Sequence, residues 1–302
     1  MARLKAASVL IVQFLSQAPA LQYQLIQEYN ASNIFEEFNF FNGSDPTGGF
    51  VQYVPFDVAA NTQLIGNGSD QIYLGVDSSN IYTPGGPGRP SVRIESKLTF
   101  TEGLFVIDLL HVPVGCGTWL ALWTTGLSSW PADGEIGIIE NVNDARSNNA
   151  AIHAKGECSV LDTANQTGTW KSTDCIINHD DNQGCGTVFT EPASFGADFN
   201  TNGGGVYAME WTSSSIRSGS SPLPDSDTFG APSASVEGPC SASFGEKFFN
   251  HSIVIDTTFC GGWAGGTFGT GTSAYPLKEG LGSLDSCVDY VASNPGAFTW
   301  GV

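Results

Sequence analysis

Short apolar runs alternate with turn-forming clusters along this 302-residue chain, and this pattern constrains its fold more than any other feature. Helical periodicity is not sustained beyond a turn or two, except over residues 284–294, which predict one short helix. Runs rich in β-branched and aromatic residues instead recur between clusters of Gly, Pro, Asn, Asp and Ser, as is typical of strands joined by turns. The predicted strands cover residues 50–54, 71–76, 91–96, 103–112, 118–124, 135–142, 150–154, 205–211 and 252–258.

Many short strands at this spacing predict an all-β protein built as a two-sheet sandwich. No internal repeat and no linker-like stretch divides the chain, so we expect a single domain over residues 21–302. Residues 213–239 are rich in Ser and Pro, and we expect them to form an irregular surface loop.

The first twenty residues have the three parts of a secretory signal peptide. Arg3 and Lys5 supply positive charge, residues 6–15 are apolar, and Ala18-Pro19-Ala20 is a cleavage sequence of the A-x-A type. The apolar run is too short to cross a bilayer and no later run is long enough, so we expect a secreted, extracellular protein with no membrane partner. Five glycosylation sequons agree with secretion, at Asn30, Asn42, Asn67, Asn165 and Asn250.

The chain has seven cysteines, and an oxidising compartment predicts that most of them form disulfides. Their spacing does not determine the connectivity. Because seven is odd, one cysteine has no partner within the chain.

The formal net charge of −19 argues against a nucleic acid as partner, because an acidic surface repels phosphate backbones. A neutral polysaccharide is not excluded. The acidity has an alternative explanation as a solubility device of a protein that works in an acidic medium.

Two glutamates, Glu135 and Glu140, occupy an otherwise apolar predicted strand. Side chains alternate between the faces of a regular strand, so residues five apart point to opposite faces. The two glutamates can share a face only if a β-bulge adds one residue between them, and bulges are frequent beside active sites. Two carboxyl groups on one face are what a glycosidase requires, with a separation of about 5–5.5 Å for a retaining enzyme. The alternative is that Glu135 lies at a turn edge, Glu140 begins a loop, and neither has a chemical role.

The segment from Glu135 to Asn143 resembles the motif G-E-[IV]-D-I-I-E-x-V-N of glycoside hydrolase family 16, in its fungal endo-β-1,3(4)-glucanase (laminarinase-like) branch. It matches the motif at every position except 137. Further blocks are similar in the same order, namely residues 86–94, 115–119, 202–210, 259–265 and 287–291. The resemblance implies a jelly-roll β-sandwich of the concanavalin A-like type, with a long groove for a β-glucan.

The resemblance also implies roles for individual residues. Glu135 would be the nucleophile and Glu140 the general acid/base. Trp119, Trp123 and His153 would contact the substrate, although ordinary core packing of the two tryptophans and a structural role for the histidine are the alternatives. No cofactor and no metal ion are expected.

Position 137 departs from the family, because this chain has Gly137 where the motif has Asp. An Asp two residues after the nucleophile would lie beside its carboxyl group and help to separate the two catalytic pKa values. Gly137 is expected to leave a hole that only water fills, and to lower turnover by about 10²-fold, whereas glucan binding should be less affected.

Other departures concern the sheets and the cysteines. The family has an aromatic strand segment after Arg217 and a last strand after the Asn294-Pro295 region, both of which this sequence lacks. Their absence predicts unpaired sheet edges. The missing eighth cysteine is expected to leave Cys287 without its partner. An imperfect gene prediction would explain all three departures.

Other motifs are weak or absent. Asp174, Asp180, Asp181 and Asn182 lack the spacing of a calcium loop and are interpreted as a turn flanked by a disulfide. His111, His153, His179 and His251 form no metal-binding pattern, and no nucleophile elbow, phosphate loop or dinucleotide fingerprint occurs.

The sequence therefore predicts a monomeric, secreted endo-β-1,3(4)-glucanase that hydrolyses β-1,3 or mixed-linkage glucan with retention. Three alternatives remain open. They are a transglycosylase that uses the same glutamates, a glucan-binding protein that has lost catalysis, and an unstable product of a wrongly predicted transcript.

Overall fold

The computed structural model describes residues 23–68, 70–127, 130–160, 165–177, 182–221, 230–237, 240, 244–271 and 273–298. The predicted signal peptide, His179, Asp180 and Asp181 lie outside these residues. Within them, no helix is both long enough and apolar enough to cross a membrane.

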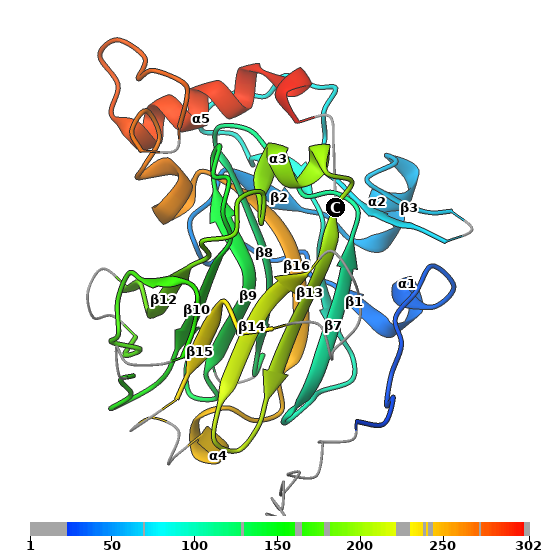
Figure 1. The fold of residues 1–302 in the computed structure, drawn as a ribbon. Helices are drawn as coiled ribbons and strands as arrows, with labels where there is room; N and C mark the ends of the chain where they lie inside the picture. The colour runs from blue at the N-terminus through cyan, green and yellow to red at the C-terminus, as the bar shows by residue number, and fades with distance from the viewer. Residues whose placement is uncertain are drawn as a thin grey trace, which may run out of the picture.

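The larger of the two main sheets has eight antiparallel strands in the order β1-β6-β16-β8-β9-β10-β12-β11. In that order the strands are Phe38–Phe40, Arg93–Ser96, Ser252–Phe259, Thr118–Thr125, Glu135–Val142, Asn149–His153, Cys185–Val188 and Thr169–Trp170. The second sheet has the order β15-β14-β13-β7, with strands Ala234–Val236, Ile216–Ser221, Gly205–Trp211 and Gly103–Leu109. The four-stranded sheet lies in front of the larger one in Figure 1, which confirms the all-β sandwich.

The two sheets enclose the main hydrophobic core, to which alternate residues of each strand contribute. On β9 these are Ile136, Ile138 and Ile139, and they pack with Tyr207, Met209 and Trp211 of β13. We call the opposite side of the eight-stranded sheet, which turns away from this core, the site face.

Two smaller pairs of strands complete the sheet structure. β2 (Val51–Tyr53) pairs in parallel with β5 (Arg89–Ser91), and β3 (Ile65–Asn67) pairs with β4 (Ile72–Leu74). The nine predicted strands are therefore all present, with shifted ends, and residues 91–96 are divided between β5 and β6.

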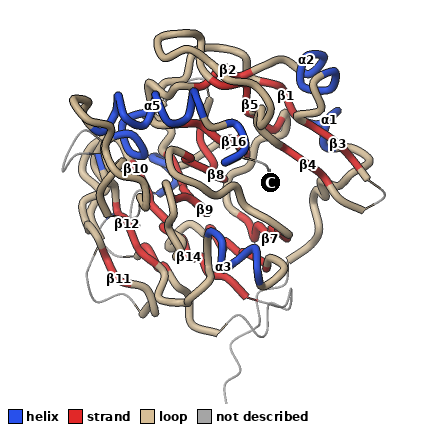
Figure 2. Tube along the Cα trace, turned by 90° about the horizontal axis from the view of Figure 1, so that it is seen from above, coloured by secondary structure: helices blue, strands red, loops and turns tan. Residues whose placement is uncertain are grey.

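The helix predicted over residues 284–294 is present as α5 (Ser283–Ser293), but it is not the only helix. The described part of the chain also contains four shorter helices, α1 (Ile34–Glu37), α2 (Phe56–Asn61), α3 (Gly196–Thr201) and α4 (Phe244–Lys247). A π-helical turn at Gly261–Gly265 and a 3-10 turn at Pro295–Ala297 flank α5 in sequence. Seen from above in Figure 2, α5, α2 and α1 lie toward the rim of the molecule. The helices α1 to α4 have only four to six residues each, which is too short for a periodic apolar pattern to reveal them in the sequence.

The prediction of an irregular loop over residues 213–239 is wrong in part. β14 and β15 both lie in this segment, and β14 pairs with β13 along its whole length from Ile216↔Trp211 to Ser221↔Val206. The sheet therefore continues after Arg217 without an aromatic segment. The small residues Ser218 and Gly219 carry little strand propensity, so their pairing is set by the neighbouring strands.

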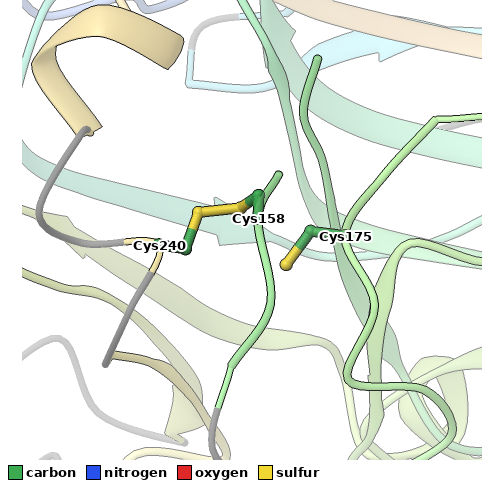
Figure 3. Close-up of side chains that lie close together, drawn as sticks. All are labelled: Cys158, Cys175 and Cys240. Atoms are coloured by element: carbon green, nitrogen blue, oxygen red, sulfur yellow. A yellow bond between two sulfur atoms is a disulfide. The ribbon is translucent and has the colours of Figure 1, made fainter. Parts of the chain in front are cut away.

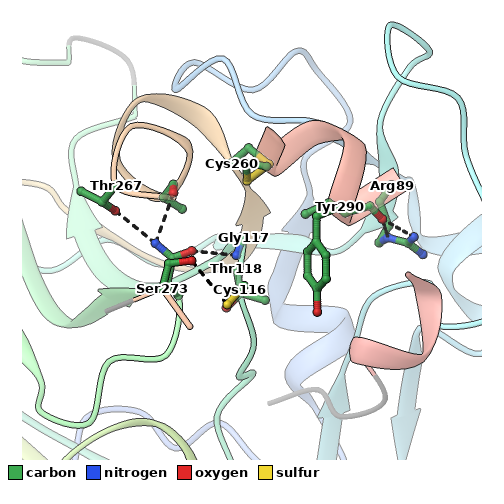
Figure 4. Close-up of a disulfide and its surroundings, with 12 residues drawn as sticks. Arg89, Cys116, Gly117, Thr118, Cys260, Thr267, Ser273 and Tyr290 are labelled. Atoms are coloured by element: carbon green, nitrogen blue, oxygen red, sulfur yellow. Dashed lines mark hydrogen bonds between the residues drawn. A yellow bond between two sulfur atoms is a disulfide. The ribbon is translucent and has the colours of Figure 1, made fainter. Parts of the chain in front are cut away.

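Three disulfides link Cys158 to Cys240, Cys175 to Cys185, and Cys260 to Cys287. The prediction that Cys287 lacks a partner is therefore wrong, and Cys116 is the free, buried thiol. Figure 4 shows the Cys116 sulfur separate from the Cys260 disulfide. The Cys175–Cys185 bridge confirms the disulfide expected to flank the turn after Asp174.

Candidate active site

A β-bulge in β9 brings the two glutamates to one face. On the β8 side, consecutive residues Leu122 and Trp123 pair with Ile139 and Gly137, so Ile138 is the extra residue. The register with β10 shifts at the same place. Both isoleucines at the bulge enter the core, and both glutamates lie on the site face. The predicted bulge is confirmed.

Asn148, which precedes β10, satisfies the backbone groups that the bulge leaves without ladder partners. Its side chain is fully buried. Its Nδ2 donates a hydrogen bond to the carbonyl oxygen of Ile138 at 2.8 Å, and its Oδ1 accepts one from the backbone N–H of Glu140 at 3.0 Å. The side-chain amide thus replaces a backbone pair at the position where an extra residue disrupts the ladder.

Glu135, at the start of β9, is held by two groups that favour its ionised form. The Nδ1 of His153 lies 3.1 Å from its Oε1, and the indole N–H of Trp130 donates to its Oε2 at 2.9 Å. The other ring nitrogen of His153 lies 3.0 Å from the carbonyl oxygen of Asn182, which fixes the imidazole ring. The Glu135 side chain is 18% exposed.

Glu140, at the far side of the bulge, has a different environment. Its Oε1 accepts a hydrogen bond from the indole N–H of Trp119 at 2.8 Å. No cationic side chain makes a salt bridge with it among the described residues.

These environments move the two pKa values in opposite directions. Burial raises the pKa of Glu140, and the nearby charge of Glu135 raises it further, to about 7. Burial alone would also raise the pKa of Glu135, but the charge and hydrogen bond of His153 and the bond from Trp130 outweigh burial and lower it. The carboxylate partners raise the pKa of His153 to about 9 against the opposing effect of burial. At neutral pH an ionised carboxylate and a carboxyl group that holds its proton in about half of the molecules therefore lie on one face.

A second polar cluster lies on the site face across β8, β16 and β6. Asp256 is 7% exposed and accepts hydrogen bonds from the indole N–H of Trp123 at 2.8 Å and from the hydroxyl of Tyr53 at 2.9 Å. The guanidinium of Arg93 lies over the rings of Phe41 and Trp123, at 4.6 and 5.3 Å from their centroids. Asp256 pairs in register with Ala121, which pairs with Glu140, so this cluster adjoins the two glutamates.

All five residues predicted from the sequence are therefore close together on the site face. Trp119 bonds to Glu140, Trp123 bonds to Asp256, and His153 contacts Glu135. The ring of Trp263, from the π-helical turn, packs against Trp119 edge-on at 5.5 Å.

Residues 38–301 match the family described as the XgeA-like catalytic GH16 domain. The chain belongs to glycoside hydrolase family 16. It is 42% identical to a probable endo-1,3(4)-β-glucanase of Aspergillus flavus over 97% of its own length and 45% of that protein, so it spans about half the length of such curated relatives. A solved structure described as an elongating family 16 β-1,3-glucosyltransferase has a TM-score of 0.85 and 39% identity, and covers 92% of this chain and 96% of that one. Laminarinase 16A of Phanerochaete chrysosporium, solved with β-glucans in donor and acceptor sites, has a TM-score of 0.82 and 35% identity, over 92% of this chain and 95% of that one.

Gly137 does not leave the open hole expected from the family motif. A Cβ at this position would lie 3.3 Å from Oε2 of Glu140 and 3.2 Å from the carbonyl oxygen of Ala151. The carboxyl group of Glu140 therefore borders the space that another side chain would enter. The separation of pKa values expected from the family Asp is also present here, with His153 as a principal cause.

The sulfur atoms of Cys158, Cys175 and Cys240 lie within 4.8 Å of one another, as Figure 3 illustrates. Each belongs to a disulfide, so none supplies the thiolate that a metal ion requires. His251 is enclosed between Thr124 and the carbonyl oxygen of Asp133, in a structural role.

Sequence reasoning missed four residues of the site: Arg93, Trp130, Asn148 and Asp256. Asp256 had a detectable signal, because it is an acid within the apolar predicted strand 252–258. Asn148 lies in a polar stretch before the next strand and gave no comparable signal.

Proposed function

We propose that this domain is a secreted, endo-acting β-glucanase that cleaves β-1,3 or mixed β-1,3/1,4 linkages with retention. The observation that carries the proposal is the pair Glu135 and Glu140, which share the site face and have pKa values moved in opposite directions. The names of the A. flavus relative and of laminarinase 16A support a β-glucan as substrate.

The ionised Glu135 is the nucleophile in this proposal. Its carboxylate attacks the anomeric carbon while Glu140 gives its proton to the departing glycosidic oxygen, which forms a covalent glycosyl-enzyme. Glu140, now ionised, takes a proton from water, and the resulting hydroxide displaces Glu135 from the sugar. The separation of about 5–5.5 Å that retention requires stays a prediction.

Hydrolysis is tested by the release of reducing sugar from laminarin and from mixed-linkage glucan. The wild-type protein is expected to release it, and Glu135→Gln and Glu140→Gln are each expected to lower the rate by at least about 10³-fold. Pull-down on insoluble glucan runs beside this assay. Glucan binding with no difference in sugar release between wild type and Glu135→Gln would refute the hydrolase and support a glucan-binding protein.

Transglycosylation is the second candidate, favoured by the 39% identical structure described as an elongating glucosyltransferase. In that reaction a sugar hydroxyl replaces water in the second step. Mass spectrometry of laminarihexaose digests separates the two reactions, because transfer produces chains longer than the starting hexaose and hydrolysis only shorter ones.

Secretion and a monomeric state belong to the same proposal. Cleavage after Ala20 would be seen by N-terminal sequencing of protein from culture medium, and the monomer by light scattering. An intact N-terminus with protein retained in the cell would contradict secretion.

A further inference from the structure

The side chain of His251 lies behind the turn that leads into Glu135. It is fully buried directly before β16, and its ring centroid lies 4.9 Å from that of Trp211 and 6.2 Å from that of Phe248. Its Nε2 lies 2.6 Å from the carbonyl oxygen of Asp133, two residues before Glu135. No step of the proposed reaction uses this buried imidazole.

The contacts of the imidazole ring fix its tautomer. A carbonyl oxygen can only accept a hydrogen bond, so Nε2 of His251 carries the proton and donates to Asp133. Nδ1 lies 2.9 Å from the hydroxyl of Thr124, which donates to it when the ring is neutral. Burial lowers the pKa of His251, and the charges of Asp133 and Glu135 do not cancel this effect, so the ring is neutral at neutral pH. Hydrogen bonds therefore run from Thr124 through the ring to the backbone of Asp133.

The turn held in this way carries Trp130. A second anchor lies next to the first, because the hydroxyl of Thr125 donates to the carbonyl oxygen of Gly134 at 2.7 Å. At the other end of the turn, the indole N–H of Trp130 donates to Oε2 of Glu135 at 2.9 Å. Trp130 is 50% exposed, so protein contacts cover only half of it and the backbone of the turn determines where the indole lies.

We propose that His251 is a positioning residue for Glu135, because its neutral imidazole holds the carbonyl group of Asp133 and thereby keeps the indole of Trp130 on the carboxylate. This inference rests on the proposed function, in which Glu135 is the nucleophile. Displacement of the turn would weaken the bond from Trp130, which lowers the pKa of Glu135. The titratable groups that face this carboxylate are His153 on β10, Glu140 on β9 and His251 itself.

Two substitutions separate the two contacts of the ring. The amide of His251→Gln reaches the position of Nε2, so it keeps a donor for Asp133 and loses the acceptor for Thr124. The shorter His251→Asn places its amide near the position of Nδ1, so it keeps a partner for Thr124 and loses the donor for Asp133. Both variants lack the imidazole, so any direct effect of its charge on Glu135 is the same in the two.

The pKa of Glu135 provides a readout that needs no turnover. It is measured from the NMR shift of the carboxyl carbon as the pH is varied, and the signal is assigned by its absence in Glu135→Gln. We expect a higher pKa in His251→Asn than in the wild type, and a pKa close to the wild-type value in His251→Gln. Equal pKa values in the two variants would overturn the proposal.

Thr124→Val replaces His251→Asn if that variant does not fold. Valine has nearly the size of threonine but lacks the hydroxyl that orients the imidazole ring. The pKa of Glu135 is again expected to rise, and an unshifted pKa in the folded Thr124→Val variant would overturn the proposal.

Hydrolysis of laminarin provides the second readout. We expect kcat to fall about 10-fold in His251→Asn and less than about 3-fold in His251→Gln. Trp130→Phe removes the indole donor, so adding His251→Asn to it should cause less than about 2-fold further loss, because both residues act through one contact. Losses that multiply would overturn the route through Trp130. A wild-type protein that hydrolyses no glucan would refute the proposed function, whereas the pKa comparison would still decide the role of His251.

Discussion

The amide of Asn148 holds the backbone of Glu140 by accepting its N–H at 3.0 Å, while its Nδ2 binds the carbonyl oxygen of Ile138 at 2.8 Å. One buried side chain therefore stabilises the bulge that puts the second glutamate on the same face as the first. Within the described structure, the Asn148 side chain forms no hydrogen bond with either carboxyl group, yet the geometry of the site depends on it.

Asn148→Leu removes both of these hydrogen bonds and leaves two backbone groups unpaired. The free energy of unfolding is expected to fall by roughly 1–3 kcal/mol, measured by urea denaturation. Activity on laminarin should fall about 10²-fold, because a small displacement of Glu140 misaligns the proposed proton donor. Asn148→Asp keeps the acceptor for the Glu140 N–H and should be intermediate in activity. Equal activities for the two variants would show that the bulge does not depend on this contact.

His153→Gln should move the whole pH profile of kcat/KM to higher pH. Loss of the imidazolium raises the pKa of Glu135, so the acid limb of the profile moves to higher pH. The charge of His153 also lowers the pKa of Glu140, so the alkaline limb, near pH 7 in the wild type, moves up as well. Lys97→Met removes one positive charge outside the site and serves as the control. If both limbs of the pH profile stay in place in His153→Gln, the assignment of His153 as a group that lowers both pKa values is wrong.

Glu140→Gln should be inactive yet more stable than the wild type at neutral pH. The pKa of Glu140 is about 7 in the folded protein against an ordinary value of 4.5, so the unfolded chain releases this proton first. Below pH 4.5 both states hold the proton; as pH rises to 7 the folded state loses stability, by up to ~3 kcal/mol. Gln does not titrate, so the Glu140→Gln variant has no such loss. The difference in free energy of unfolding between the variant and the wild type, measured by urea denaturation, should therefore grow between pH 4.5 and 7 and then level off. An advantage that is independent of pH would refute the raised pKa.

Gly137→Asp should increase the rate of hydrolysis about 10-fold or more, provided that Glu140 shifts to admit the new carboxyl group. The required shift is small, because the nearest side-chain atom to a Cβ at 137 is the flexible end of Glu140. Gly137→Ala is the matched control, since it adds the Cβ without a carboxyl group. If Asp and Ala behave alike on laminarin and mixed-linkage glucan, the effect of position 137 is steric and the account based on the family Asp is wrong.

Ser273→Cys should form a fourth disulfide with Cys116. The Oγ of Ser273 lies 3.5 Å from the Cys116 sulfur, and 157 residues separate the two positions. Closing such a long loop is expected to stabilise the protein by ~2 kcal/mol. Thiol titration in denaturant should find one free thiol in the wild type and none in the variant. Two titratable thiols in the variant would show that the positions cannot be bridged.

The sequence alone determined the features that depend on near neighbours. Alternating apolar runs predicted the strands, and the five-residue spacing of Glu135 and Glu140 required a bulge if they were to share a face. Side-chain alternation is a local property, so it can be read along the chain without knowledge of what packs against it.

Only the tertiary structure decided how the two glutamates differ and which distant groups surround them. His153 reaches Glu135 across a strand pair, Asp256 lies 133 positions from its partner Trp123, and Cys287 bonds to Cys260 so that Cys116 is left free. Such partners are fixed by sheet order and register, and pKa values by burial and charge at short range. Neither the partners of a strand nor the pKa values of its side chains produce a periodic pattern in the sequence. The spacing could therefore identify the two acids as candidates, but it could not show which of them holds the proton.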